Sequence, residues 1–228
     1  MKAISGSVRR ARPLLGTLVE IRATGANAVR AVERAFAAIE RVHRAMSAQE
    51  SSSDIARLRA GHRSALDPWT RRVLARADEI REGTAGLFDC AACDYALDGI
   101  AKGFAVDCAV ETLQLAGLRA GVVNAGGDLR VFGEAFEDIY VRTPDKPDAL
   151  LHIGRARDCA VATSASVLLV DPRRRDSWAA PPAATVIAAD CMTADALTKP
   201  YLLEPQRAPD FAARFGAHFL VPGAPACL

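Results

Sequence analysis

The hydrophobic residues of the first half of the chain recur at helical spacing. One stripe predicts a helix that begins after Asn27 and buries one face, with apolar positions three or four residues apart at Val29, Val32, Phe36, Ile39, Val42 and Met46. A short helix is expected after the turn at 51–54. A further helix is predicted from Asp67-Pro68 to Gly83, because aspartate caps helices and proline favours their first position. Another follows the loop at 97–103 and ends near Gly117.

The second half of the chain carries short runs rich in β-branched residues, which predict strands. One strand is expected early, at 16–22, and the others at 121–124, 129–132, 138–142, 150–154, 159–162, 167–170, 184–189 and 217–221. A short helix begins near Thr193, and the segment 173–182 has a loop-like composition. Because helices cluster early and strands late, we expect an α+β fold of mixed or antiparallel sheets with packed helices. Residues 12–222 would form one domain, with two lobes as an alternative, after a basic tail at 1–11.

Composition narrows the class of protein without selecting a partner. The 228 residues are 50% hydrophobic and 25% charged, as in soluble globular proteins, and a net charge of +2 favours no nucleic-acid contact. No apolar run is long enough to span a membrane, and no apolar signal core follows Lys2, so a cytoplasmic protein without membrane contact is expected. The six cysteines are expected to be reduced, and Cys90-Ala-Ala-Cys93 lacks the second ligand pair of a zinc site.

A glycine-rich loop before a helix is the first candidate for chemistry. Asp98-Gly99-Ile100-Ala101-Lys102-Gly103 combines backbone N–H groups at a helix start with one of only four lysines in the chain, which suits a phosphate or pyrophosphate. Asn124-Ala125-Gly126-Gly127-Asp128 follows after one helix and one strand. On geometry alone, a simple hairpin turn is the favoured interpretation of Gly126-Gly127.

The second candidate is the helix that begins near Thr193. Asp195, Thr198 and Lys199 share one face of it, and a carboxylate with a hydroxyl can supply oxygen ligands to Mg²⁺. The alternative is a surface ion pair between Asp195 and Lys199, worth a few tenths of a kcal/mol. Pro200 is expected to end or kink this helix.

Taken in order, these motifs resemble those of the ApbE-type FAD:protein FMN transferases. The resemblance runs from about residue 12 to residue 221 and is carried by Gly16-Thr17, Leu87-Phe88-Asp89, 97–103 with Asp107, 124–128, 162–164, Asp171-Pro172 and 193–197. It implies a Mg²⁺-dependent enzyme that transfers FMN from FAD to a Thr or Ser hydroxyl of an acceptor protein and releases AMP. Phosphoryl transfer of this kind needs positive charge against the phosphate oxygens and a base for the attacking hydroxyl.

The resemblance also implies roles for individual residues. The backbone carbonyl of Gly99 and the side chains of Asp195 and Thr198 would hold the metal, and Asp195 and Asp171 would be catalytic. The flavin nucleotide would contact Lys102, Leu87, Phe88, Asp89, Asp98, Asp107, Gly126, Gly127, Asp128 and Ser164.

The chain departs from the family pattern at four of its site positions. Ala96 stands where the family has a nucleotide-contacting Asp, which is absent or moved to Asp98; Leu168 replaces a His; Lys199 replaces a metal-binding Thr; and Arg59 replaces an Asn. The link from residue 89 to residue 97 is also shorter than in the family. Lys199 should pair with Asp195 and compete with Mg²⁺, so that it weakens the metal site or replaces part of its charge.

Two function classes therefore remain open. The first is an active transferase in which Thr198 and Asp98 stand in for displaced residues. The second is an impaired homologue that binds a flavin nucleotide or a partner protein without transfer. His152 is a candidate replacement base, while a role in structure is the simpler interpretation of all four histidines. The sequence contains neither a Walker motif nor a Gly-x-Ser-x-Gly elbow, which disfavours an unrelated hydrolase.

Overall fold

The computed structural model describes residues 6–143, 146–164, 168–174, 176–179 and 183–220. In these residues one seven-stranded sheet, with every neighbouring pair antiparallel, has the order β1-β2-β3-β4-β7-β10-β11. Its strands are β1 (Gly6–Leu14), β2 (Thr17–Gly25), β3 (Ala120–Ala125), β4 (Asp128–Gly133), β7 (Ala160–Ser164), β10 (Ala184–Ala188) and β11 (His218–Leu220). Two hairpins are separate from it: β5 (Glu137–Thr143) with β6 (Lys146–Ala156), and β8 (Leu168–Asp171) with β9 (Asp176–Ala179).

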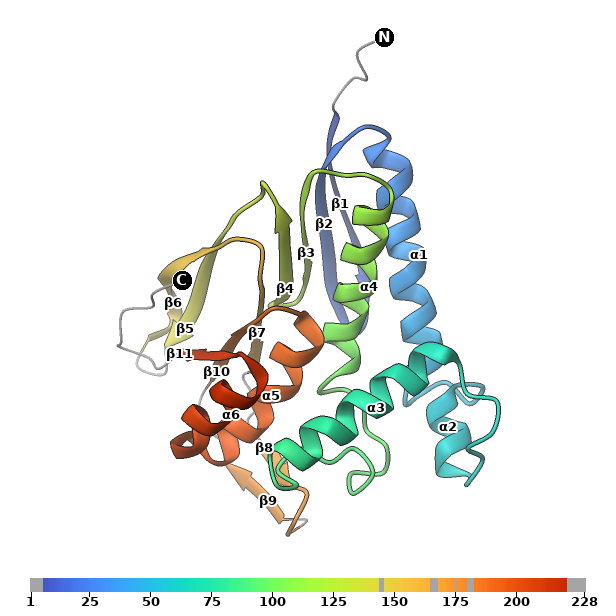
Figure 1. The fold of residues 1–228 in the computed structure, drawn as a ribbon, viewed down its shortest axis with the longest axis vertical. Coiled ribbons are helices and arrows are strands. Elements are labelled where there is room, and N and C mark those ends of the chain that lie inside the picture. The colour runs from blue at the N-terminus through green and yellow to red at the C-terminus, as the bar shows by residue number, and fades with distance from the viewer. Residues whose placement is uncertain (1–5, 144–145, 165–167, 175, 180–182, 221–228) are drawn as a thin grey trace.

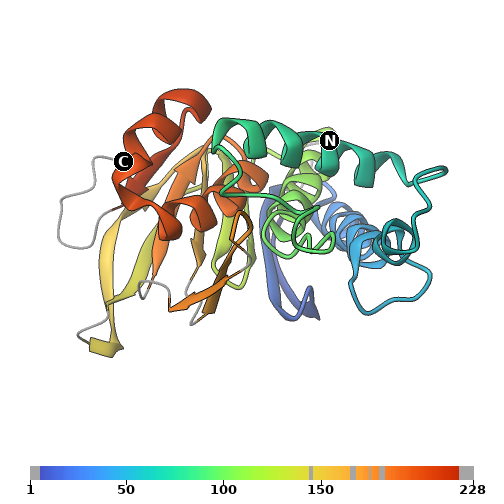
Figure 2. The same ribbon diagram turned by 90° about the horizontal axis from the view of Figure 1, so that it is seen from below.

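Helices cover one face of the large sheet, which confirms the expected α+β class (Figure 1). They are α1 (Ala28–Met46), α2 (Asp54–Arg59), α3 (Pro68–Gly83), α4 (Ala101–Leu115), α5 (Cys191–Leu203) and α6 (Ala208–Phe215), with a 3₁₀ turn at Pro205–Arg207. Figure 2 shows α3 running from the α5–α6 side of the molecule to the α1–α2 side. No helix in the described part of the chain is long and apolar enough to cross a membrane.

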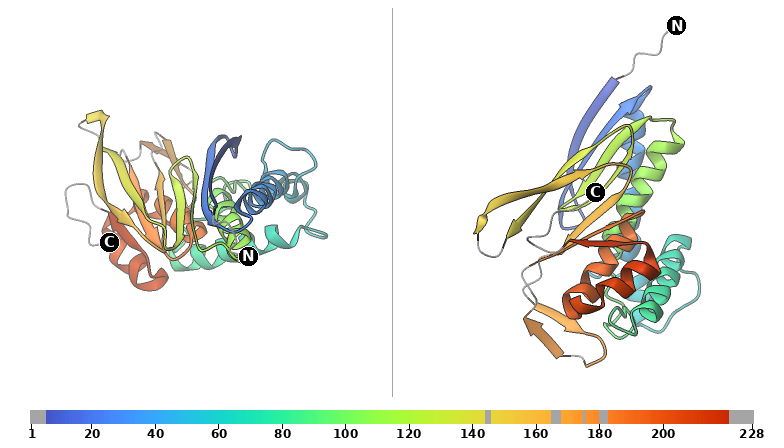
Figure 3. Two further views of the ribbon diagram at one scale, coloured as in Figure 1. Left: turned by 90° about the horizontal axis from the view of Figure 1, so that it is seen from above. Right: turned by 60° about the vertical axis from the view of Figure 1, so that its left-hand side comes forward.

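The β5–β6 hairpin lies on the opposite face of the sheet from α1 and α4 (Figure 3). Strand β3 shows why both faces are covered, because successive side chains point to opposite sides of a strand. Val123 belongs to the large core under the helices, whereas Val122 packs in a second cluster with Ile139 of β5 and Ala156 of β6. The sheet is therefore buried on both faces at its centre.

The helix starts and the buried helix faces follow the sequence pattern, with two corrections in α1. Ser53 and Asp67 cap α2 and α3 through their side chains, as predicted. Asn27 precedes α1 but makes no side-chain cap, since its φ of 57° is left-handed. Val29, expected to be buried, is 56% exposed, and Ala28 lies in the core instead.

Four local predictions differ from the structure. Residues 6–11, expected in a tail, form most of β1, an edge strand that pairs only with β2 and whose arginines and Pro13 suit an exposed edge. Part of the loop-like segment forms β9, and α6 was not anticipated. Helix α5 continues through Pro200 to Leu203, because burial on nearly all sides compensates for the lost backbone hydrogen bond.

Candidate functional site

The start of α4 and the turn between β3 and β4 bring Lys102 and Asp128 together. Gly126 and Gly127 have φ of +67° and +105°, so they form the hairpin turn that geometry alone favours, and Asn124 Oδ1 accepts a hydrogen bond from the Gly127 N–H at 3.0 Å. The turn places Asp128 Oδ2 2.7 Å from Lys102 Nζ. The two sequence motifs therefore meet in one site through an ion pair.

A cavity of about 380 Å³ opens beside Lys102. Its size falls in the range of small-molecule sites. Asp98 and Lys102 line it from the α4 side, and Gly16 from the turn between β1 and β2. The remaining lining residues are Leu15, Ala101 and a group at the end of α1: His43, Met46, Ser47, Ala48 and Gln49.

Sequence reasoning missed the contribution of α1 to this cavity. The position of His43 next to the apolar stripe of α1 favours a structural role, and Ser47 and Gln49 belong to no motif. In the structure the half-buried ring of His43 lines the same cavity as Lys102. The sequence feature that could have indicated this contribution is the run of polar residues directly after the predicted amphipathic helix.

Asp195 lies in α5, packed against the first turn of α4. Its residue is 1% exposed, and its Oδ2 accepts the Gly103 N–H at 3.1 Å. A Cβ on Gly103 would lie 2.2 Å from the Cys191 carbonyl oxygen, so only glycine permits this approach of the two helices. The predicted pairing is confirmed: Lys199 Nζ lies 2.8 Å from Asp195 Oδ1.

Burial and neighbouring charges shift the pKa values of the charged groups in the site. Burial, followed by the negative charge of Asp195, raises the pKa of Asp128 to about 6, and Lys102 opposes this shift. Burial disfavours the charge of Lys102, but its pairing with Asp128 outweighs this and raises the pKa of the ammonium group. The site therefore keeps Lys102 as a fixed positive charge.

The donor set does not fit a Mg²⁺ ion in the arrangement that the resemblance implies. Both oxygens of Asp195 are engaged, by Gly103 and by Lys199, and the Thr198 hydroxyl donates to the Asp195 backbone carbonyl at 2.7 Å. The stem of Lys199 lies against Gly99, where an added Cβ would be 2.9 Å from Lys199 Cε. No three His, Cys, Asp or Glu side chains of the described residues gather closely enough to hold a metal, Cys90 and Cys93 included.

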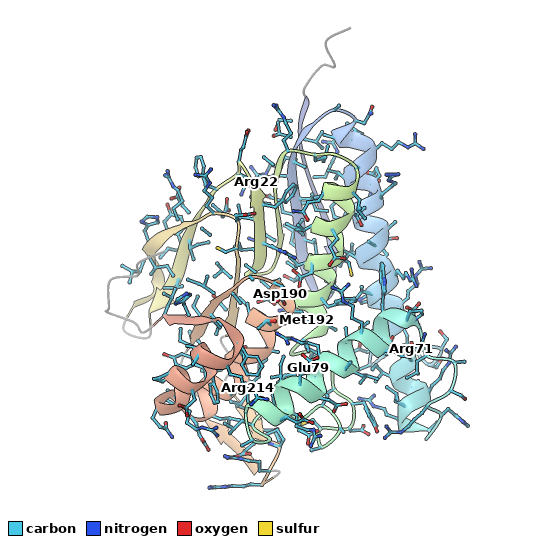
Figure 4. The ribbon with its side chains drawn as sticks, in the orientation of Figure 1. Arg22, Arg71, Glu79, Asp190, Met192 and Arg214 are labelled. Atoms are coloured by element: carbon cyan, nitrogen blue, oxygen red, sulfur yellow. The ribbon has the colours of Figure 1, made fainter. Side chains whose placement is uncertain are left out.

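Asp107 faces α5 and does not line the cavity, so its expected contact with the nucleotide stays a prediction. Its two oxygens accept the N–H groups of Cys191 and Met192 at 2.9 and 2.8 Å, and Arg130 lies 2.7 Å away. Figure 4 shows Met192 and Asp190 at this start of α5, beside α4. With these three bonds, Asp107 joins α4, α5 and β4.

The Leu87-Phe88-Asp89 segment also lies away from the cavity. Leu87 and Phe88 are 1% and 6% exposed and belong to two hydrophobic clusters, so they pack in the core, and their expected contact with the flavin stays a prediction. Asp89 Oδ1 accepts the Ala92 N–H at 2.9 Å, and the residue lines a separate crevice of about 90 Å³. The apolar residues of the motif are explained by packing.

Asp171 and Ser164 do not line the cavity either. Asp171 is engaged by Arg173 through its backbone N–H and its guanidinium, which lowers the pKa of the carboxyl group. Arg173 also pairs with Glu204 at 2.7 Å. A carboxylate held in this way joins β8 to the end of α5 and is a poor base, which does not support the catalytic role predicted for Asp171. Ser164 ends β7 and pairs in register with Ala184.

The other positions that depart from the family pattern lie in three places. Arg59 ties α2 to the residues before α4, since its Nε donates to the Asp94 carbonyl at 3.0 Å and its Nη1 to the Ala48 carbonyl at 3.3 Å. Asp98 is exposed at the cavity, whereas Ala96 is half-buried and does not line it. Leu168 begins β8, and its side chain lies outside the described residues.

The position of His152 does not support a role as the replacement base. It lies on β6, in the hairpin that covers the far face of the sheet, and pairs with Asp138 at 3.2 Å. Its ring packs at a tilt against that of Tyr140, with centroids 5.2 Å apart. The seven-stranded sheet therefore separates it from the α4 start.

Solved flavin transferases share this fold. The flavin transferase ApbE from Vibrio cholerae matches with a TM-score of 0.80 at 19% identity, over 95% of this chain and 93% of that chain. The ApbE protein from Thermotoga maritima matches with a TM-score of 0.81 at 22% identity, over 94% of each chain. The apo form of the Pseudomonas stutzeri flavinyl transferase ApbE matches with a TM-score of 0.79 at 18% identity, over 96% of this chain and 92% of that chain. No curated protein sequence matches the chain.

The sequence model of the ApbE family matches residues 15–96 and 92–220. The protein therefore belongs to the ApbE family, which confirms the resemblance of its motifs.

Proposed function

We propose that this protein binds FAD and transfers its FMN moiety to the hydroxyl of a Thr or Ser in an acceptor protein. The acceptor oxygen forms a bond to the FMN phosphorus, and the bond from that phosphorus to the bridging oxygen breaks. AMP leaves with the bridging oxygen, and the hydroxyl proton passes to a base on the cavity wall and from there to solvent. The reaction needs positive charge at the phosphates and a cavity for part of the dinucleotide.

The observation that carries the proposal is the position of Lys102, in the first turn of α4 and on the wall of the cavity. Amide groups at a helix start favour anions, but Asp195 already takes the Gly103 N–H, so the charge of Lys102 is the main attraction for a phosphate here. We assign Lys102 to the phosphates of FAD. Asp98 and His43, on the same wall, are the groups that can accept a proton from a hydroxyl there.

Mg²⁺, which the family resemblance implies, has no role in this proposal, because the Lys199 ammonium lies 2.8 Å from Asp195 Oδ1 and the other oxygen of that carboxylate accepts the Gly103 N–H. The metal-binding roles of Gly99, Asp195 and Thr198 are therefore not proposed.

A second candidate function is flavin-nucleotide binding without transfer. The ion pair of Lys199 with Asp195 supports this second candidate. A single ammonium charge would stand near the phosphates where the family resemblance implies a doubly charged metal ion. Leu168 supports it as well, because leucine cannot exchange a proton where the family has a histidine.

A mass measurement distinguishes the two candidates. The protein is incubated with FAD and an acceptor domain that other members of the family modify, once with Mg²⁺ and once with EDTA. Transfer predicts an FMN adduct on the acceptor together with free AMP, and Lys102→Met should abolish both while the fold is kept, as checked by circular dichroism. FAD binding without adduct selects the second candidate. Absence of both binding and adduct contradicts both functions.

A further inference from the structure

Lys199 lies against two of the three residues that the resemblance assigns to the metal, Asp195 and Gly99. Its ammonium lies 2.8 Å from Asp195 Oδ1 and 3.3 Å from the Asp195 backbone carbonyl oxygen, and its stem packs on Gly99. The Asp195 side chain is 2% exposed, while that of Lys199 is 24% exposed. The carboxylate is thus closed to the solvent and the ammonium faces outward from it.

A second pair of the same kind stands beside the first. Lys102 lies 2.7 Å from Asp128, with exposed fractions of 30% and 3%. Asp195 accepts the N–H of Gly103, the residue next to Lys102, and the stem of Lys199 lies against Gly99, so both pairs lie at the start of α4. In both pairs a buried carboxylate holds a partly exposed ammonium, in a chain with only four lysines.

We propose that Lys199 takes the place of the divalent cation, so that this chain binds the phosphates of a flavin nucleotide with two lysines and no metal. An ammonium is a compact point charge with three donors, and Lys199 directs two of its donors at Asp195, which leaves one for a phosphate oxygen. A cation at Asp195 would have to displace an attached positive charge from a buried carboxylate. The identity of the ligand, a flavin nucleotide, rests on the proposed function; the exclusion of the metal does not.

Two measurements on the full chain test this proposal. Mn²⁺, a probe for the Mg²⁺ position, is titrated against the protein by electron paramagnetic resonance. FAD binding is followed by flavin fluorescence, with EDTA and with Mg²⁺. Wild-type protein should bind no Mn²⁺ at the site and should have the same FAD affinity in both buffers. Lys199→Thr, which restores a hydroxyl next to a freed carboxylate, should gain a Mn²⁺ site. In EDTA it should bind FAD about tenfold more weakly, the usual effect of losing one charged hydrogen bond, and it should recover with Mg²⁺.

The same substitution at another lysine is the matched control. Lys146→Thr on β6 removes one positive charge outside the two pairs and should behave as wild type in both titrations. Wild-type protein that binds Mn²⁺ as tightly as Lys199→Thr, or that loses FAD in EDTA, overturns the proposal even if the variant does not fold. Wild-type protein that binds FAD in neither buffer contradicts the proposed function, while the Mn²⁺ comparison still decides the role of Lys199.

Discussion

Gly103 determines how closely the two helices of the site approach each other. Its amide donates to Asp195, and the Cys191 carbonyl lies where its Cβ would be. In an ordinary helix interior, replacing glycine by alanine stabilises the folded protein by about 0.5–1 kcal/mol, because the unfolded chain then has less conformational entropy to lose. At this position the contact with backbone atoms outweighs that gain.

We therefore expect Gly103→Ala to destabilise the protein by about 3 kcal/mol, at the upper end of the cost of overpacking. Urea unfolding at equilibrium measures the change. Gly6→Ala is the control, since nothing lies within 4 Å of its added Cβ, and it should leave the midpoint nearly unchanged. Equal stability of the two variants would show that α4 and α5 separate without cost.

At the scale of the elements, the starts of α4 and α5 differ in how their amides are satisfied. Asp190 caps α5 through the Thr193 N–H at 2.7 Å, and Asp107 takes the N–H groups of Cys191 and Met192. Helix α5 therefore has few amides to offer a ligand. In α4 the N-cap residue Ile100 makes no side-chain cap, but Asp195 takes the Gly103 N–H and the Leu97 carbonyl takes the Ala101 N–H, so this helix start also has few amides to offer.

The junction of α4 and α5 also predicts a dependence of stability on pH. Burial raises the pKa of Asp107 to about 6 in the folded protein, although Arg130 and two amides oppose the shift. The unfolded value is about 3.9, so the folded state binds the proton more tightly. The stabilisation from this group is complete below about pH 4 and is lost as the pH rises through about 6, a change of about 3 kcal/mol.

Asp107→Asn should flatten this dependence between about pH 4 and 6.5. The comparison uses the slope of the unfolding free energy against pH, because the lost helix cap also lowers the variant's stability at every pH. Some slope should remain, since burial raises the pKa of Asp128 to about 6 as well. A slope identical to that of the wild type would mean that Asp107 titrates alike in the folded and unfolded states.

At the scale of the whole molecule, the sheet has two different covers. The helices bury one face in a core that includes residues from Val8 to Ala217. The other face is covered in part by the β5–β6 hairpin, where a smaller cluster includes Val131 and Ile139. The hairpin is thus held to the sheet by few apolar side chains.

Ile139→Ala should cost about 2–5 kcal/mol, because Ile139 is 4% exposed between the hairpin and the sheet. Hydrogen exchange should be faster in β5 and β6 than in α4 of the variant. Tyr140→Ala is the control from the same strand, since Tyr140 is 53% exposed, and should change stability by less than about 1 kcal/mol. A similar loss of stability in both variants would mean that the exposed face of β5 contributes as much to stability as the face that packs on the sheet.

The sequence by itself determined the features that depend on neighbours along the chain. Helical spacing predicted α1, α3 and α4, and the turn at Gly126-Gly127 predicted the β3–β4 hairpin. The pairing of Lys199 with Asp195 follows from positions one helical turn apart. The order of the motifs was sufficient to indicate the family.

Only the tertiary structure decided which side chains meet in the site. His43 and Lys102 line one cavity because α1 ends beside the start of α4, and Asp107 bonds to an amide 84 positions away along the chain. Motif order placed Leu87 and Phe88 at the flavin, while packing placed them in the core. Local patterns specify backbone conformation and one-turn contacts, whereas burial and cavity shape depend on the packing of segments distant in the sequence.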